Sequence, residues 1–178
     1  PLAGLAPLAW LVNAFLQDEL GANPVEEISR TTGSWALRLL LLCLAVTPLR
    51  RALRWSGLAP LRRSLGLLAF AWACLHVAVY LLLDLGLDAS AFAEDLGERP
   101  WIAAGFTAFT ALLPLAATST RANMRRLGRH WTRLHRLVHV ALVAAVVHFL
   151  WLVKLDLREP LLYAAATGLL LALRLVWW

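Results

Sequence analysis

Six apolar runs of about 15 to 21 residues divide this 178-residue chain and constrain its fold more than any other feature. They cover 2–16, 35–49, 65–85, 101–117, 134–153 and 161–178. An α-helix rises about 1.5 Å per residue, so about 20 apolar residues cross the roughly 30 Å hydrocarbon core of a bilayer. Lipid offers no partner for open backbone amides, and the runs are too long and too uniformly apolar for barrel strands. The pattern predicts an all-α integral membrane protein, a bundle of about six transmembrane helices.

The composition indicates one membrane domain over residues 1–178. Hydrophobic residues make up 61% of the chain, whereas a soluble domain is nearer 45–50% apolar. No Gly/Ser-rich linker interrupts the sequence. The first apolar run has no basic segment before it of the kind that begins a signal peptide, and we expect the N-terminus to be trimmed. Cys43 and Cys74 lie inside apolar runs, where thiols are usually small packing groups.

Charged residues alternate strictly between the connecting segments. Two segments carry arginines and no acid: Arg50, Arg51, Arg54, Arg62 and Arg63 in 47–64, and Arg121, Arg125, Arg126, Arg129 and Arg133 in 118–134. All 11 acidic residues follow the first, third and fifth runs. The positive-inside rule then predicts cytoplasmic arginine segments, external acidic segments and cytoplasmic termini. The net charge of +6 therefore reflects topology and contact with anionic lipid, not a nucleic-acid partner.

Histidines are the residues most indicative of chemistry. His76 lies in the third run, His135, His139 and His148 lie in the fifth, and His130 precedes the fifth run. A single intramembrane imidazole can simply hydrogen-bond a neighbouring helix. Several on two runs, with no intramembrane acid to pair with, favour ligation of haem iron by neutral imidazole.

The depths of these histidines predict one haem site and suggest a second. His76 and His148 both fall in the outer halves of their runs, so one haem can bridge them. His135 lies 13 residues before His148, or roughly 20 Å along a helix axis, which places it at an inner site. Thirteen residues of ideal helix turn about 220°, so these two side chains do not share a face. His139, one turn beyond His135, also lies opposite His148, and the inner ligand stays open between them.

The third run offers no inner histidine. Thirteen and fourteen residues before His76 stand Arg63 and Arg62. A guanidinium there suits a haem propionate, because its geometry matches a carboxylate. The alternative is that both arginines serve only topology. The outer site is therefore predicted to have two histidine ligands. The inner site has candidate histidines on the fifth run only.

Several segments resemble a known family. They are ANPVEEISRTTGSWALRLLLLCLAVTPLRR, LRRSLGLLAFAWACLHVAVYLLLD, ERPWIAAGF, LAATST and RRLGRHWTRLHRLVHVALVAAVVHFLW. Together they resemble the MsrQ (YedZ) family, the haem-binding membrane subunits of bacterial protein-methionine-sulfoxide reductase systems, within the ferric-reductase-like transmembrane superfamily. The resemblance extends from about Asn23 to the end of the sixth run.

The resemblance implies a multi-pass protein of the bacterial inner membrane with one or two b-type haems, and flavin mononucleotide (FMN) as a further cofactor. Its donor would be a cytoplasmic flavin reductase or quinone, and its acceptor a periplasmic molybdenum-containing methionine-sulfoxide reductase of the MsrP type. The family's histidines fall on His76, His135 and His148. The family often has tyrosine where this chain has His139. No residue is assigned to the flavin.

The sequence thus predicts an electron-transfer subunit and not a catalyst on its own. It contains no nucleophile constellation, Gly-rich phosphate loop or nicotinamide domain. A self-contained ferric or quinone reductase and an assembly scaffold are further alternatives. The alternative from another class is a transporter or channel with histidines as proton relays, but such proteins usually pair histidine with buried acids.

Overall fold

The computed structural model describes residue 4 and residues 6–176, and over these residues the chain forms helices and no β-strand. The helices are α1 (Ala6–Leu16), α2 (Pro24–Ala52), η2 (Ser56–Leu58), α3 (Ala59–Val79), the π-helical segment η3 (Tyr80–Asp84), α4 (Ala89–Glu98), α5 (Pro100–Ala117), α6 (Arg121–Leu127), α7 (Arg129–Leu134), α8 (Leu137–Leu152) and α9 (Arg158–Val176). The prediction of an all-α protein is confirmed.

Five helical segments are long and apolar enough to cross a membrane: Pro24–Ala52, Ser56–Asp84, Pro100–Ala117, Arg129–Leu152 and Arg158–Val176. They correspond to the second to sixth predicted runs. The described part of the first run, α1, has 11 residues, so a sixth span stays a prediction. Residue 1, residues 2, 3 and 5 of the first run, and residues 177–178 of the last run lie outside the described residues.

The second span is longer than the predicted 35–49 because helix signals precede its apolar stretch. The Asn23 side chain accepts a hydrogen bond from the Glu26 backbone N–H, and Pro24 stands in the first turn. An asparagine cap, an early proline and acids near a helix N-terminus all favour helix initiation. α2 therefore begins at Pro24 and carries its acidic first turn beyond the apolar stretch.

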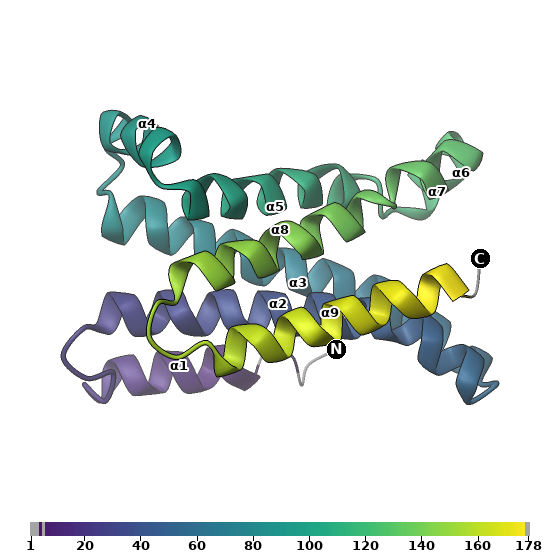
Figure 1. The fold of residues 1–178 in the computed structure, drawn as a ribbon, viewed down its shortest axis with the longest axis horizontal. Helices are drawn as coiled ribbons and strands as arrows, with labels where there is room; N and C mark the ends of the chain where they lie inside the picture. The colour runs from purple at the N-terminus through teal and green to yellow at the C-terminus, as the bar shows by residue number, and fades with distance from the viewer. Residues whose placement is uncertain (1–3, 5, 177–178) are drawn as a thin grey trace.

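The connecting segments gather at two opposite ends of the molecule (Figure 1). Segments 17–23, 85–99 and 153–157 lie at one end, called here the acidic end. Segments 53–58 and 118–136 lie at the other, the arginine end. The acidic residues are thus confined to one end and the acid-free arginine segments to the other, as the alternation in the sequence predicts. The assignment of the arginine end and the termini to the cytoplasm stays a prediction.

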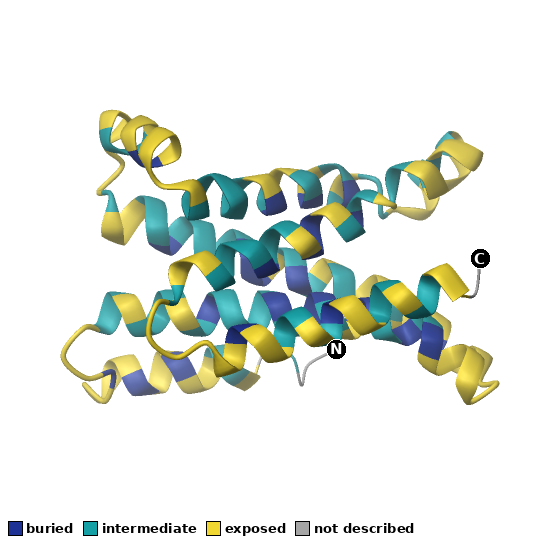
Figure 2. Cartoon of the chain, in the orientation of Figure 1, coloured by how far each residue is buried: buried dark blue, intermediate teal, exposed yellow. Residues whose placement is uncertain are grey.

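The core lies where two helix pairs meet. α2 packs most closely on α3, and α5 on α8; α3 also contacts α5, and α2 contacts α8 and α9. α3 and α8 therefore lie diagonally across a four-helix arrangement. Leu44, Ala69, Ala141 and Leu142 are fully enclosed between the pairs. Large apolar side chains are exposed on the outward helix surfaces (Figure 2), as lipid-facing positions require.

Candidate functional site

His76 and His148 face each other across the bundle. His76 projects from α3 and His148 from α8, the two diagonal helices, and their ring centres are 6.2 Å apart with the ring planes at 71°. These residues are 72 positions apart in the chain. The structure brings together the two histidines that the sequence assigns to the outer site.

This separation fits two imidazoles that share one metal ion. Their ring centres would be roughly 6 Å apart, since each metal–nitrogen bond is about 2 Å long and each ring adds about 1 Å. Among the described residues, no group of three or more His, Cys, Asp or Glu side chains is placed to bind a bare metal ion. Two facing imidazoles suit a metal whose remaining ligands come from a macrocycle such as haem.

Backbone carbonyls fix the tautomer of both rings. His76 Nδ1 lies 3.0 Å from the Ser29 carbonyl oxygen, and His148 Nδ1 lies 2.6 Å from the Trp101 carbonyl oxygen. A carbonyl only accepts, so each Nδ1 must carry the proton and donate it. Each Nε2 then keeps a free lone pair, which is the arrangement that orients histidine as a metal ligand.

Two glycines make room for the rings. A Cβ atom on Gly105, in α5, would lie 2.9 Å from His148 Nδ1. A Cβ atom on Gly33, in α2, would lie 3.0 Å from His76 Cε1. Helices α2 and α5 can therefore approach the two rings only because these positions lack a side chain.

A group of polar and aromatic side chains lies at the end of α3, on the acidic-end side of His76. Tyr80, four residues after His76 in the π-helical segment, donates its hydroxyl to Asp95 Oδ2 at 2.6 Å. Asp95 is 7% exposed and also binds Arg99. The Phe106 ring lies 6.1 Å from the Tyr80 ring. These contacts hold α4 over the end of α3, and π-helical segments are frequent at functional sites.

The predicted fifth run is interrupted near its inner end. Between α7 and α8, the N–H groups of Arg136, Val138 and His139 bond to carbonyls three residues back. Such bonds turn the chain about 120° per residue instead of 100°. Over these three residues the turn between His135 and His148 rises from about 220° to roughly 280°. The interruption thus reduces the azimuthal mismatch that an ideal helix imposes.

His135 and His139 differ in their free nitrogens. His135 Nδ1 lies 3.1 Å from the Trp131 carbonyl, its ring stacks on the Trp131 ring at 3.8 Å, and its buried Nε2 has no partner among the described residues. His139 Nδ1 lies 2.9 Å from the Arg136 carbonyl, and its Nε2 accepts from Arg174 Nη1 at 2.6 Å. Of these two histidines, His135 is therefore the one with a ring nitrogen that has no hydrogen-bond partner among the described residues.

Of the two candidate arginines, Arg62 joins this inner group and Arg63 is exposed on α3. The charge on Arg62 acts on His135, His139 and Arg174. Arg174 was not found by the sequence analysis, although an arginine inside the sixth apolar run is a signal that could have found it. No feature of the sequence indicates that the Ser29 and Trp101 carbonyls contact the histidines.

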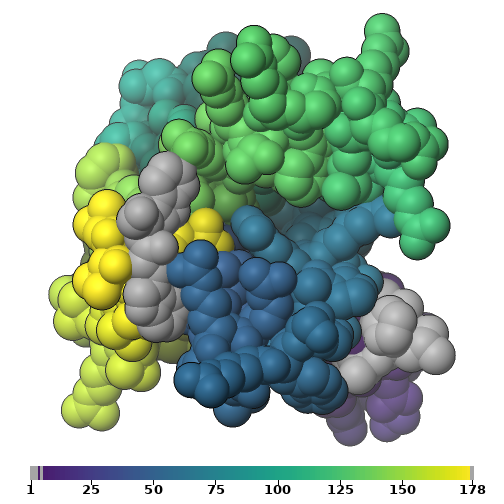
Figure 3. All heavy atoms as spheres, turned by 90° about the vertical axis from the view of Figure 1, so that its right-hand side faces the viewer, coloured from purple at the N-terminus to yellow at the C-terminus, as the bar shows by residue number. Residues whose placement is uncertain are grey.

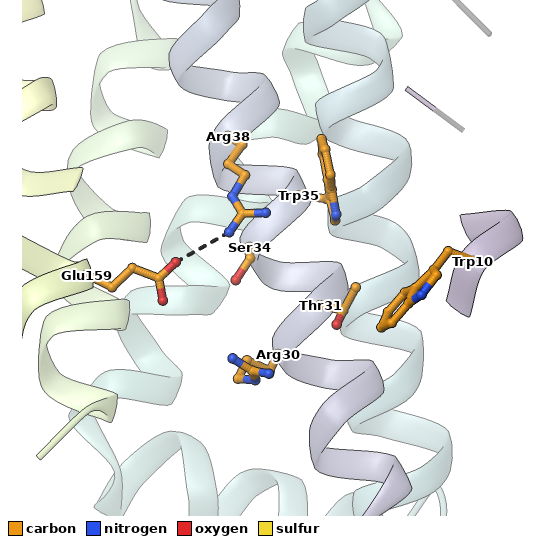
Figure 4. A pocket seen from close by; sticks show the side chains of 7 residues that line it. All are labelled: Trp10, Arg30, Thr31, Ser34, Trp35, Arg38 and Glu159. Atoms are coloured by element: carbon orange, nitrogen blue, oxygen red, sulfur yellow. Dashed lines mark hydrogen bonds and ion pairs between the residues drawn. The ribbon is translucent and has the colours of Figure 1, made fainter. Parts of the chain in front are cut away.

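A pocket opens between α1, α2 and α9 on the opposite face of α2 from His76. Its lining residues are Trp10, Arg30, Thr31, Ser34, Trp35, Arg38 and Glu159 (Figure 4). Arg38 donates from Nε to the Tyr163 hydroxyl at 2.8 Å and from Nη2 to Glu159 Oε1 at 3.3 Å. The arginines of this pocket are paired within the chain, Arg30 with Glu27, so it offers no unmet charge to a ligand.

Comparison with known proteins gives a consistent result. The family model for the "Ferric reductase like transmembrane component" matches residues 32–146. Curated relatives described as "Protein-methionine-sulfoxide reductase heme-binding subunit MsrQ" are 51% identical in Xanthomonas campestris pv. campestris, 47% in Ralstonia nicotianae and 43% in Herminiimonas arsenicoxydans. Each alignment covers 99% of this chain and 82% of the relative. No solved structure matches the chain.

Proposed function

The chain belongs to the MsrQ family of ferric-reductase-like transmembrane proteins, and on this premise we propose that it transfers electrons across the membrane through b-type haem held by His76 and His148. The resemblance found in the sequence is confirmed. The single observation that carries the haem assignment is the facing pair of imidazoles, with ring centres 6.2 Å apart and each Nδ1 held by a backbone carbonyl.

The protein's part in the chemistry is to hold and orient the ligands. Bound b-type haem supplies one-electron redox chemistry. The Ser29 and Trp101 carbonyls keep the proton on each Nδ1, and Gly33 and Gly105 let the neighbouring helices enclose the rings. Hydrogen bonds from Nδ1 to a carbonyl raise the basicity of the ligating nitrogen. The chain thereby sets ligand orientation and strength without a buried counter-charge.

We assign His135 as the candidate ligand of a second haem toward the arginine end. Its Nε2 is buried and unpartnered among the described residues, whereas both nitrogens of His139 are engaged. The tyrosine that the family often has at the position of His139 is consistent with a role other than iron ligation. FMN is proposed from the family resemblance alone.

The direction of transfer follows from the charge asymmetry. With the arginine end in the cytoplasm of the bacterial inner membrane, as the positive-inside rule predicts, a flavin reductase or quinone would donate electrons there. The acidic end would then face the periplasm and a molybdenum-containing MsrP-like partner. A proton relay is disfavoured because His76 and His148 hydrogen-bond to carbonyls and not to acids.

The test is a spectroscopic comparison on the full chain purified in mild detergent. Oxidised and dithionite-reduced spectra are recorded, and haem per polypeptide is counted by the pyridine method. We expect a six-coordinate b-type spectrum that is lost on His76→Ala or His148→Ala and kept on His139→Ala. His135→Ala should remove only the second haem. Preparations without haem, even after reconstitution, would refute the proposed function.

A further inference from the structure

We infer that Arg174 and Arg62 form a binding site for an anionic oxygen group, a carboxylate or a phosphate, at the arginine end, with His139 orienting Arg174. Arg174 lies near the end of α9, Arg62 in the first turns of α3, and His139 near the start of α8. Arg174 contacts His139 at 2.6 Å, which joins α9 to α8, and the charge on Arg62 acts on both residues from α3.

The hydrogen bonds of Arg174 leave it incompletely satisfied. Its Nη1 donates to His139 Nε2 at 2.6 Å, and its buried Nη2 has no partner within the part of the chain that the structure describes. Because His139 Nδ1 faces the Arg136 carbonyl, at 2.9 Å, His139 is the neutral tautomer with an accepting Nε2. His139 therefore positions the guanidinium without neutralising its charge.

No Asp or Glu side chain within the described residues pairs with Arg174. All 11 Asp and Glu residues lie in or within a few residues of segments 17–23, 85–99 and 153–157, which form the acidic end (Figure 1). Arg174 lies in the last turn of α9, the helix whose first turn holds Glu159. The charges on Arg62 and Arg51 act on Arg174 as well, and they are of the same sign. The Cys43 thiol donates to the Arg62 carbonyl at 3.2 Å, so it is a neutral thiol and not a counter-ion.

A cluster of like charges at membrane depth is costly unless an anion joins it. A guanidinium presents a planar fork of donors that matches a carboxylate or phosphate. Two sources of such a group reach this end: the propionate of a haem seated on His135, and the phosphate of an anionic lipid headgroup. Figure 3 looks onto this end, where 118–136 and the α2–α3 connection come to the surface. The nearby unpartnered His135 Nε2 favours the propionate.

The propionate assignment rests on the proposed function, whereas the lipid assignment does not, and the experiment separates them. The full chain in detergent is loaded with haem or with haem dimethyl ester, and the affinity of the second haem is measured by titration. Separately, retention of phosphatidylglycerol against phosphatidylcholine is measured by native mass spectrometry. Both are done for the parent, Arg174→Gln, Arg174→Lys and the control Arg125→Gln, which changes an exposed arginine at the same end of the bundle.

We expect Arg174→Gln to weaken second-haem binding about 10- to 100-fold, the effect of losing a charge-assisted hydrogen bond. Arg174→Lys should have an affinity between those of the parent and Arg174→Gln, because lysine keeps the charge without the planar pair of donors. Arg125→Gln should match the parent. With haem dimethyl ester, the parent should bind as weakly as Arg174→Gln binds haem. If Arg174→Gln instead lowers only the retention of phosphatidylglycerol and leaves second-haem binding unchanged, the site is assigned to a lipid headgroup.

Equal binding of acid and ester, together with equal retention of both lipids, in the parent and in Arg174→Gln would overturn the inference. The His76–His148 haem spectrum reports whether each variant is folded. If no haem binds anywhere, the proposed function fails, and the lipid measurement alone then decides the anion site.

Discussion

Replacing Gly105 with alanine tests the placement of the His148 ring most directly. The added Cβ would lie 2.9 Å from Nδ1 and 3.2 Å from Cε1 of this ring. Neither the α5 backbone nor the imidazole can absorb such a contact without moving. The movement must lengthen the 2.6 Å hydrogen bond from Nδ1 to the Trp101 carbonyl and turn Nε2 away from His76.

Two opposing effects determine the size of the change. Alanine is favoured over glycine in a helix by about 1 kcal/mol, whereas overpacking a well-packed site costs about 1–3 kcal/mol. The haem-free protein should therefore lose at most about 2 kcal/mol of stability. Haem affinity should fall further, by about 10- to 100-fold, because groups that orient a metal ligand typically have effects of this size.

The assay is haem titration of the purified chain, with thermal unfolding of the same samples. Gly168→Ala is the matched control, since a Cβ there meets no atom within 4 Å. The control should bind haem like the parent and unfold at an equal or higher temperature. Gly33→Ala, with a 3.0 Å contact, should be a milder form of Gly105→Ala. Unchanged haem affinity in Gly105→Ala would refute the ring position described here.

Three further predictions concern the half of the protein nearer the acidic end. Arg38→Met should destabilise the fold by about 1 kcal/mol in thermal unfolding, since the bond to the Tyr163 hydroxyl is lost but the arginine is partly exposed. Tyr80→Phe should make the α4 amides exchange about 10- to 100-fold faster, because buried Asp95 loses a 2.6 Å donor. The Ser90 hydroxyl and the backbone N–H groups of residues 91 and 90 lower the pKa of Asp88, which caps α4. This cap should stabilise α4 above pH 3.8 and be lost as the pH falls through the lowered pKa, whereas Asp88→Asn should cap α4 without this pH dependence in hydrogen exchange.

Arg30→Met removes only an ion pair within α2, with Glu27, and should cost less than about 0.5 kcal/mol. An equal loss for Arg30→Met and Arg38→Met would contradict the role of the contact between α2 and α9. Faster exchange throughout the bundle in Tyr80→Phe would contradict a local role for Tyr80. A parent and an Asp88→Asn variant with the same acid response would contradict the cap.

Composition and periodicity were enough to predict the spans and their charges. Hydrophobic runs and arginine segments are properties of the local sequence, so five of the spans and both ends could be placed without coordinates. The distance of His76 and His148 from the inner ends of their runs sufficed to pair them, because helix rise is nearly constant. Even so, the start of α2 was missed by 11 residues, since its first turns are amphipathic and capped instead of apolar.

The rest of the site depends on backbone atoms that carry no sequence signal. The Ser29 and Trp101 carbonyls are identical to every other carbonyl in the sequence, and only the packing of α2 on α3 and of α5 on α8 brings them to the histidines. The tight turn after His135 likewise depends on hydrogen bonds between residues three apart. The choice between His135 and His139 therefore needed the position of Arg174.

The two ends of the bundle differ in how their buried polar atoms are satisfied. Toward the acidic end, the Tyr80 hydroxyl, Asp95 and both Nδ1 atoms of the His76–His148 pair find partners within the chain. Of the three buried side-chain atoms without a partner among the described residues, two, His135 Nε2 and Arg174 Nη2, lie toward the arginine end. A buried unpaired polar atom costs about 1–3 kcal/mol. Ligands at the arginine end would offset this cost, so haem removal should loosen that end of the bundle before the acidic end.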